Sequence, residues 1–239
     1  MFAVQAKNCR MQFIQRRYHK NERGTIVKKL KVMLVNASTS QMGNTHEALK
    51  IAVEEFEKNG VECEIFWIGD QHLASCRHCG ECESSCRCII DDPVREFTDK
   101  SKEADGFVFA APLPRIKPDG SIARFYERCF ISSGDTFRLK PAAAMVLAIR
   151  TAKPVSFDKL NTAFFDAEMP VIGSIYCNLL HYRKEPESVA KDAEGVAAVR
   201  RLAKDMTYWM RCREAGAMVG ILPPEKEKSL FEGMRFMRL

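Results

Sequence analysis

The chain has 239 residues, of which 46% are apolar and 28% are charged, a composition typical of a globular protein. No apolar run approaches the ~18 residues of a membrane-spanning helix, and the charged N-terminus lacks a secretory signal, so we expect a cytoplasmic protein without a membrane partner. The net charge is +6, but residues 1–31 hold nine basic residues and one acidic residue, against 28 basic and 30 acidic residues elsewhere. Because the basicity lies in a terminal segment, we expect no nucleic-acid partner.

Composition divides the chain into three segments. Residues 1–30 are rich in Arg and Lys and have no hydrophobic period, so we predict a basic extension that is disordered or precedes a natural translation start near Val27. A transit peptide is disfavoured because the segment is poor in Ser. We predict one domain over residues 31–215, followed by a C-terminal tail over residues 216–239.

Strand and helix patterns alternate from Lys31 onward. The first part predicts a strand at 31–36, a helix at 45–59, a strand at 61–68, a loop at 69–92, a helix at 93–103 and a strand at 106–111. The second part predicts a helix at 120–131, a strand at 142–149, a helix at 155–166, a strand at 171–176 and a helix at 188–213. The inner side of this last helix is predicted to carry Val196, Val199, Leu202, Met206 and Trp209.

This alternation predicts an α/β protein with a doubly wound five-stranded parallel sheet and helices on both faces. Ligands of such sheets bind beyond the carboxyl ends of the strands. We therefore expect chemistry in the loops that follow the first, third and fourth strands.

The loop after the first strand, residues 36–45, is dense in hydroxyl and amide side chains and runs into a helix start. Helix N-termini present free N–H groups that hold phosphate, and Gly43 permits a tight turn. Neither a triphosphate-binding nor a dinucleotide-binding glycine motif is present. The loop therefore favours a monophosphate such as that of FMN, and the alternative is an ordinary polar loop capped by Thr or Asn.

Five of the ten cysteines lie between Cys76 and Cys88. Cys76, Cys79 and Cys82 form a C-x2-C-x2-C pattern, and the fourth thiolate is Cys86 or Cys88. Thiolates bind soft metals, and four within one stretch favour an iron–sulfur cluster over structural zinc, although redox-active or unliganded thiols remain alternatives. The other five are expected to be small buried apolar residues: Cys9, Cys63, Cys129, Cys177 and Cys212.

The loop after the third strand, residues 111–121, is rich in Pro. A stiff backbone suits a wall beside a flavin ring, and Arg115 or Lys117 could stabilise negative charge on reduced flavin. An ordinary strand–helix connection is the alternative.

Together these loops resemble the NADPH-dependent FMN reductase family and its iron–sulfur flavoproteins. The matching residues are Ser38, Gly43, Asn44 and Thr45; Cys76, Cys79, Cys82 and Cys88 followed by Asp91 and Asp92; and Pro112, Gly120, Ile122, Phe125, Glu127 and Arg128. The resemblance selects Cys88 as the fourth ligand of a [4Fe–4S] cluster. It implies a flavodoxin-like fold and a homodimer or homotetramer with FMN near a subunit interface. The implied FMN-binding residues are Ser38, Ser40, Asn44, Thr45, Pro112, Leu113, Pro114, Arg115, Arg150 and Thr151.

The leading hypothesis is an FMN-binding oxidoreductase or electron-transfer protein with a [4Fe–4S] cluster. One alternative is an NAD(P)H-dependent FMN or quinone reductase without a cluster. Another is a non-catalytic flavodoxin-like domain whose cysteine loop binds zinc or a partner. No catalytic acid–base or nucleophilic triad is evident, so the expected partners are an electron donor and an electron acceptor, either small molecules or proteins.

Overall fold

The computed structural model describes residues 18–20, 26–70, 72–113, 120–149, 154–175, 178–182 and 188–225. Five parallel strands form the central sheet in the order β4-β3-β5-β6-β7. Their bounds are β3 (Lys31–Asn36), β4 (Glu62–Trp67), β5 (Gly106–Leu113), β6 (Ala142–Ala148) and β7 (Leu179–His181). This order confirms the predicted doubly wound α/β fold, and the first four strands lie where their apolar runs predict them.

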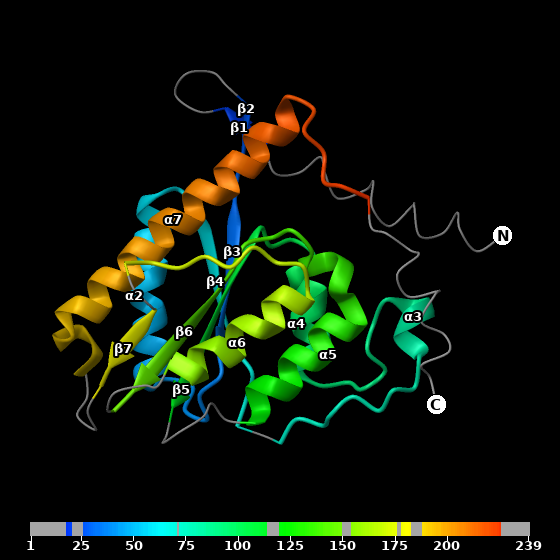
Figure 1. Cartoon of the computed structure of the whole chain (residues 1–239), viewed down its shortest axis with the longest axis horizontal. Helices are drawn as coiled ribbons and strands as arrows, with labels where there is room; N and C mark the ends of the chain where they lie inside the picture. Colours follow the sequence, from blue (N-terminus) through cyan, green and yellow to red (C-terminus); the bar gives the residue numbers. More distant parts are fainter. Residues whose placement is uncertain are drawn as a thin grey trace.

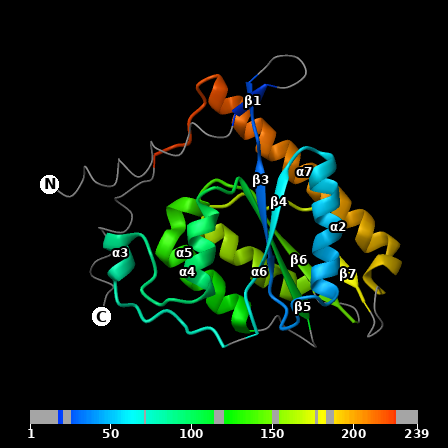
Figure 2. The same cartoon turned by 180° about the vertical axis from the view of Figure 1, so that it is seen from behind.

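Helices cover both faces of the sheet (Figures 1 and 2). One face packs against α2 (Asn44–Lys58) and α7 (Ala193–Met218), and the other against α4 (Pro93–Ser101), α5 (Gly120–Phe137) and α6 (Pro154–Asp166). Every residue of β6 is buried, because the strand lies between two helical layers. None of the helices in the described ranges has the length and apolarity needed to cross a bilayer.

The fifth strand differs from its prediction. The sequence predicts a strand at 171–176, but within the described residues Val171 makes only an isolated bridge to Ala142, and the strand β7 begins at Leu179. The side-chain Nδ2 of Asn178 donates to the carbonyl of Ala144 at 2.9 Å. An amide side chain thus hydrogen-bonds to the backbone of β6 directly before β7 begins.

The last helix also differs from its prediction. Residues Ser188–Lys191 form a separate 3₁₀ turn, η2, and α7 begins at Ala193. The helix begins there because Asp192 is its N-cap. The Asp192 carboxylate accepts from Gly195 N at 3.0 Å and also from His181 N of β7 at 2.6 Å. The prediction that Trp209 faces inward was wrong, since 55% of it is exposed.

Three further segments contain structure that their patterns do not predict. The cysteine loop includes a short helix, α3 (Glu81–Ser85), and α5 continues past residue 131 to Phe137 with a break at Ser133. Within residues 1–30, β1 (Tyr18–Lys20) and β2 (Ile26–Lys28) form an antiparallel pair. Lys28 pairs with Asp105, and with Glu214 of α7 at 3.2 Å, which attaches β2 to the domain.

Candidate functional site

The loop after β3 is fixed by Asn36, the last residue of the strand, whose side chain is fully buried. Its Oδ1 accepts from Ser38 N and its Nδ2 donates to the Gln41 carbonyl, both at 3.0 Å. From β4, the indole Nε1 of Trp67 donates to the Ser38 carbonyl at 2.8 Å. Ser40 N donates to Ser38 Oγ at 3.2 Å. Side chains from two neighbouring strands therefore hold the loop in one shape.

The helix α2 starts directly after this loop. Its N-cap residue, Gly43, has no side chain and supplies no capping hydrogen bond, so the predicted alternative of a Thr or Asn cap is not observed. A Cβ at position 43 would lie 3.0 Å from Ser40 Oγ, so this close turn fits a glycine. The first-turn N–H groups and the positive end of the helix dipole suit an anion such as a phosphate.

The four residues predicted to bind phosphate lie together at this loop–helix junction. Ser40 is exposed, Ser38 and Asn44 are half-buried, and Thr45 is buried in the first turn of α2. The junction is at the carboxyl end of β3, next to β5, where the strand order reverses. This location and the neutral donors fit the monophosphate of FMN.

Part of the predicted flavin wall is described. Pro112 and Leu113 end β5 and are in register with Leu147 and Ala148 at the end of β6. They lie on the same edge of the sheet as residues 36–45, which are called the phosphate loop because they are predicted to bind phosphate. Leu113 is buried and Pro112 is half-buried. The other predicted residues of the wall lie outside the described residues: Pro114, Arg115, Lys117, Arg150 and Thr151.

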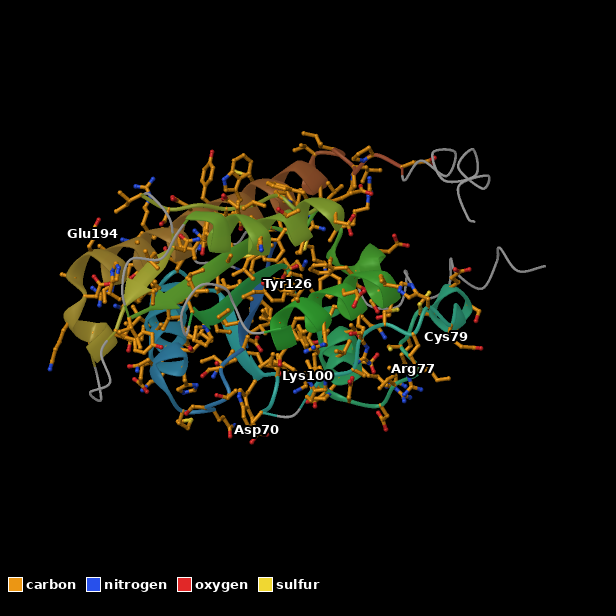
Figure 3. All side chains as sticks on the ribbon, turned by 60° about the horizontal axis from the view of Figure 1, so that its bottom comes forward. Asp70, Arg77, Cys79, Lys100, Tyr126 and Glu194 are labelled. Carbon is orange, nitrogen blue, oxygen red and sulfur yellow. The ribbon has the colours of Figure 1, made fainter. Side chains whose placement is uncertain are left out.

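The cysteine loop leaves the end of β4, passes through α3 and reaches α4. Figure 3 shows Cys79 and Arg77 beside α3 at one end of the molecule, far from Glu194 at the start of α7. Cys79 and Cys86 are exposed, whereas Cys76, Cys82 and Cys88 are half-buried. His78, Gly80 and Cys86 have positive φ values of 49°, 75° and 51°. These left-handed residues turn the loop sharply and keep its thiols in a small region.

The helix α5 is the support on which this loop rests. Cys82 Sγ donates to the Ile131 carbonyl at 3.9 Å, and Ser133 Oγ donates to the Cys86 carbonyl at 3.4 Å. Cys76 N donates to Glu127 Oε2 at 3.5 Å. The segment 127–133 of α5 therefore contacts the loop at both its beginning and its end.

Cys82 lies among the other three predicted ligands. Burial raises the pKa of the Cys82 thiol, and the neighbouring thiolates of Cys76, Cys79 and Cys88 raise it further, whereas Cys86 does not contribute. Within the described ranges, no three Cys, His, Asp or Glu side chains are close enough to share a metal ion. The donor set of four clustered thiols fits a soft metal or an iron–sulfur cluster, and the loop would have to close around it.

Arg128 of α5 joins the two ends of the cysteine loop. Its guanidinium forms a two-point ion pair with Asp92, donates to Cys88 Sγ at 3.2 Å and reaches the Ala74 carbonyl at 3.4 Å. Burial lowers the pKa of Arg128, but hydrogen bonds to Asp92 and Cys88 outweigh this effect and the net shift is upward. Asp92 also caps α4 by accepting from Val94 N at 3.1 Å.

The sequence analysis missed the roles of Asn36, Trp67 and Arg128. Asn36 ends an otherwise apolar strand, and a polar residue at that position is a signal that could have been used. Arg128 stands among apolar residues of a helix, which is a similar signal. Of the remaining cysteines, Cys129 is buried as predicted and Cys63 is half-buried, whereas the prediction of a buried Cys212 was wrong because this residue is exposed. Cys9 and Cys177 lie outside the described residues.

The strand order defines a flavodoxin-like α/β domain. The structure is similar to a flavodoxin from the domain Archaea with a TM-score of 0.52 and 15% identity, covering 76% of this chain and 99% of the other. The sequence matches the model of the NADPH-dependent FMN reductase family over residues 30–183. The chain belongs to this oxidoreductase family.

Four curated relatives are named iron–sulfur flavoprotein, and two of them illustrate the likeness. The relative from Methanosarcina thermophila is 25% identical over 120 residues, which are 50% of this chain and 63% of that protein. The relative from Archaeoglobus fulgidus is 25% identical over 183 residues, which are 72% of this chain and 94% of that protein. The chain thus matches less than two thirds of the first relative and nearly all of the second.

Proposed function

We propose that this protein is an FMN-dependent electron-transfer oxidoreductase that carries a [4Fe–4S] cluster on Cys76, Cys79, Cys82 and Cys88, with NAD(P)H as a candidate electron donor. The observation that carries the proposal is that one domain holds both a braced loop at the start of α2 and a cysteine loop that contacts α5.

The FMN part is supported by the residues at the phosphate loop. Asn36 and Trp67 hold the loop before any ligand arrives, so binding orders less backbone and costs less entropy. The start of α2 supplies N–H donors and partial positive charge. Leu113 at the end of β5 adds an apolar surface on the same edge of the sheet.

The cluster part is supported by the thiol chemistry and its surroundings. The charges of three other loop cysteines, Cys76, Cys79 and Cys88, act on Cys82, and together with Cys82 they are the four that the family resemblance selects. The relatives' names add to this support. When bound, FMN exchanges one or two electrons and the cluster exchanges one; this chain's residues bind the groups and set their surroundings.

The first test is anaerobic purification followed by flavin extraction and by iron and sulfide analysis. We expect about one FMN and about four irons per chain, the content of a cubane cluster. Replacing Cys88 with Ser should remove the iron and leave the FMN, whereas replacing the exposed Cys212 with Ser should leave both. A protein that fails to take up iron and sulfide during anaerobic reconstitution would contradict the cluster assignment.

A second candidate is an NAD(P)H-dependent flavin or quinone reductase without a cluster. The observation that favours it is the lack of a close metal-ligand group among the described residues. It predicts a yellow, iron-free protein that oxidises NADPH with added FMN or quinone, with the Cys88→Ser variant retaining that activity.

A further inference from the structure

Arg128 is the largest fully buried side chain among the described residues, with 1% of its surface exposed. Burying a guanidinium costs several kcal/mol unless it is paired and hydrogen-bonded. A helix that packs on a sheet would ordinarily carry an apolar residue at such a position. The cation therefore requires an explanation beyond packing.

The partners of Arg128 lie at the two ends of the cysteine loop. Ala74, whose carbonyl it reaches at 3.4 Å, comes two residues before Cys76, and Cys88 is the last cysteine of the loop. Asp92 balances the charge of the guanidinium through two contacts, one of them between Nη2 and Oδ1 at 3.0 Å. The same Nη2 donates to Cys88 Sγ at 3.2 Å.

The Asp92 pair alone would balance the buried charge, so the contact with Cys88 is additional. A hydrogen bond to a ligating sulfur withdraws negative charge from it, and in iron–sulfur sites such bonds help to set the reduction potential. Reduction adds negative charge to the site, and a buried cation next to a ligand stabilises that charge in a medium of low dielectric constant.

We propose that Arg128 is the positioning residue of the cysteine loop, which fixes Cys88 as the fourth ligand and raises the reduction potential of the cluster by its charge and by its hydrogen bond to sulfur. This inference rests on the proposed function.

The test uses two substitutions that change the local charge in opposite directions. Arg128→Met removes the cation and the sulfur donor, whereas Asp92→Asn keeps Arg128 and removes the carboxylate that neutralises it. Arg95→Met is the matched control, because Arg95 lies on the neighbouring helix α4 and pairs with Asp91 at 3.4 Å. The full chain is reconstituted anaerobically with iron and sulfide, and the midpoint potential is measured by dithionite titration followed by EPR.

We expect Arg128→Met to disfavour the reduced state about tenfold, which is a decrease of about 59 mV for one electron, and Asp92→Asn to favour it by a similar factor. Arg95→Met should change the equilibrium less than about twofold, because Arg95 pairs with Asp91, whose side chain is 88% exposed, and solvent screens such a pair. FMN content of every variant reports whether the domain is folded. If Arg128→Met does not retain iron, Arg128→Lys tests the hydrogen bond to sulfur at constant charge and should lower the potential by a smaller amount, while Asp92→Asn should still raise it.

Three outcomes separate the hypotheses. Opposite shifts for the two charge changes support the role of Arg128. Equal midpoint potentials in the wild type and both variants would show that Arg128 is merely structural. Loss of iron from both variants, with no opposite shifts in the potential of the remaining cluster, would show the same. A wild-type protein that binds FMN but never binds iron would overturn the proposed function itself.

Discussion

At the scale of single residues, Asn36 has the clearest effect on the phosphate loop, because its two hydrogen bonds set the shape of that loop. Replacing it with Ala leaves Ser38 N and the Gln41 carbonyl without these partners. Each lost bond costs about 0.5–1.5 kcal/mol, so we expect the Kd for FMN to rise about tenfold. Fluorescence quenching of FMN on titration measures it.

The matched control is Asn59→Ala at the other end of α2. Asn59 Nδ2 donates to the Glu55 carbonyl at 2.7 Å, so this change also removes an amide from an end of the same helix. It should leave the Kd for FMN unchanged. Equal losses of affinity in the two variants would mean that helix stability, and not the shape of the loop, controls binding.

Cys63 predicts a pH dependence of stability. Burial, followed by the charges of Glu57 and Glu62, raises the pKa of its thiol to about 12 from the ordinary value of 9.0. Because the folded pKa is above the unfolded pKa, the folded state holds the proton more tightly, and this contribution to stability is present below pH 9.0 and is lost as the pH rises toward 12.

Thermal unfolding at successive pH values checks this prediction. The midpoint of the wild type should fall more steeply above pH 9.0 than that of Cys63→Ala. At pH 8 the Cys63 thiol should react with iodoacetamide far more slowly than the exposed Cys212, because the thiolate is the nucleophile. Parallel curves for the two proteins would show that Cys63 does not contribute.

At the scale of elements, the interrupted fifth strand depends on Asn178. The residue is fully buried, and its amide satisfies the carbonyl of Ala144. Asn178→Leu should lower the free energy of unfolding by about 1–3 kcal/mol, the cost of leaving a buried carbonyl unpaired. Urea unfolding gives the value.

Thr207→Val is a suitable comparison for Asn178→Leu. The Thr207 hydroxyl is buried and donates to the Ala203 carbonyl at 2.7 Å, but that carbonyl is inside a helix. The Val variant should therefore lose little stability. If both variants lose the same amount, the bridging role of Asn178 in the sheet is wrong.

The start of α7 depends on Asp192, which caps Gly195 N and accepts from His181 N. Asp192→Ala should cost about 1–2 kcal/mol in urea unfolding. Asp205→Ala, which removes an exposed i,i+4 pair with Arg201, should cost less than about 0.5 kcal/mol. Similar costs for the two changes would argue against the cap.

The sequence predicts most of these elements for simple physical reasons. Strands such as β5 and β6 are buried on both faces, so their apolar runs are continuous and bounded by turns. The fifth strand could not be placed because the apolar run 171–176 has the pattern of a strand. The observed strand begins only at Leu179, after Asn178, whose side-chain amide hydrogen-bonds to the neighbouring strand β6. The start of α7 was misplaced because the Asp192 carboxylate, which caps the helix, also accepts a hydrogen bond from His181 of β7, a contact that no local sequence pattern contains.

The residues of the candidate site could be predicted from the sequence, but the side chains that hold its loops in place could not. The Ser, Thr, Asn and Cys residues stand out because their chemistry is concentrated in short segments. Trp67 and Arg128 act through contacts between segments far apart in the chain, which no local pattern contains, whereas Asn36 acts on the loop that directly follows it. Arg128 lies 40 residues from Cys88, and their contact forms only because α5 packs beneath the loop.

At the scale of the whole molecule, FMN should stabilise the fold by mass action. At a concentration about 100 times its Kd, a ligand that binds only the folded state adds about 2.7 kcal/mol, which for a protein of this size is a rise of about 5–10 °C in Tm. Differential scanning fluorimetry without added dye, or calorimetry, measures the shift.

Riboflavin is the natural control for this measurement, because it has the same ring and lacks the phosphate. If the loop before α2 holds the phosphate, riboflavin at equal concentration should stabilise the protein much less. Equal shifts for the two ligands would place the binding energy in the ring and not at the start of α2.

The two edges of the sheet are protected from pairing with another chain in different ways. An exposed, regular edge strand is a template for aggregation. On β4 the edge carries Glu62 and Glu64, which pair with Lys29 at 3.1 Å and Lys31 at 2.7 Å. At the other edge, β7 has only three residues, Leu179–His181, so it offers few unpaired backbone groups to a second chain. A short edge strand of this kind gives intermolecular strand pairing little ladder to extend.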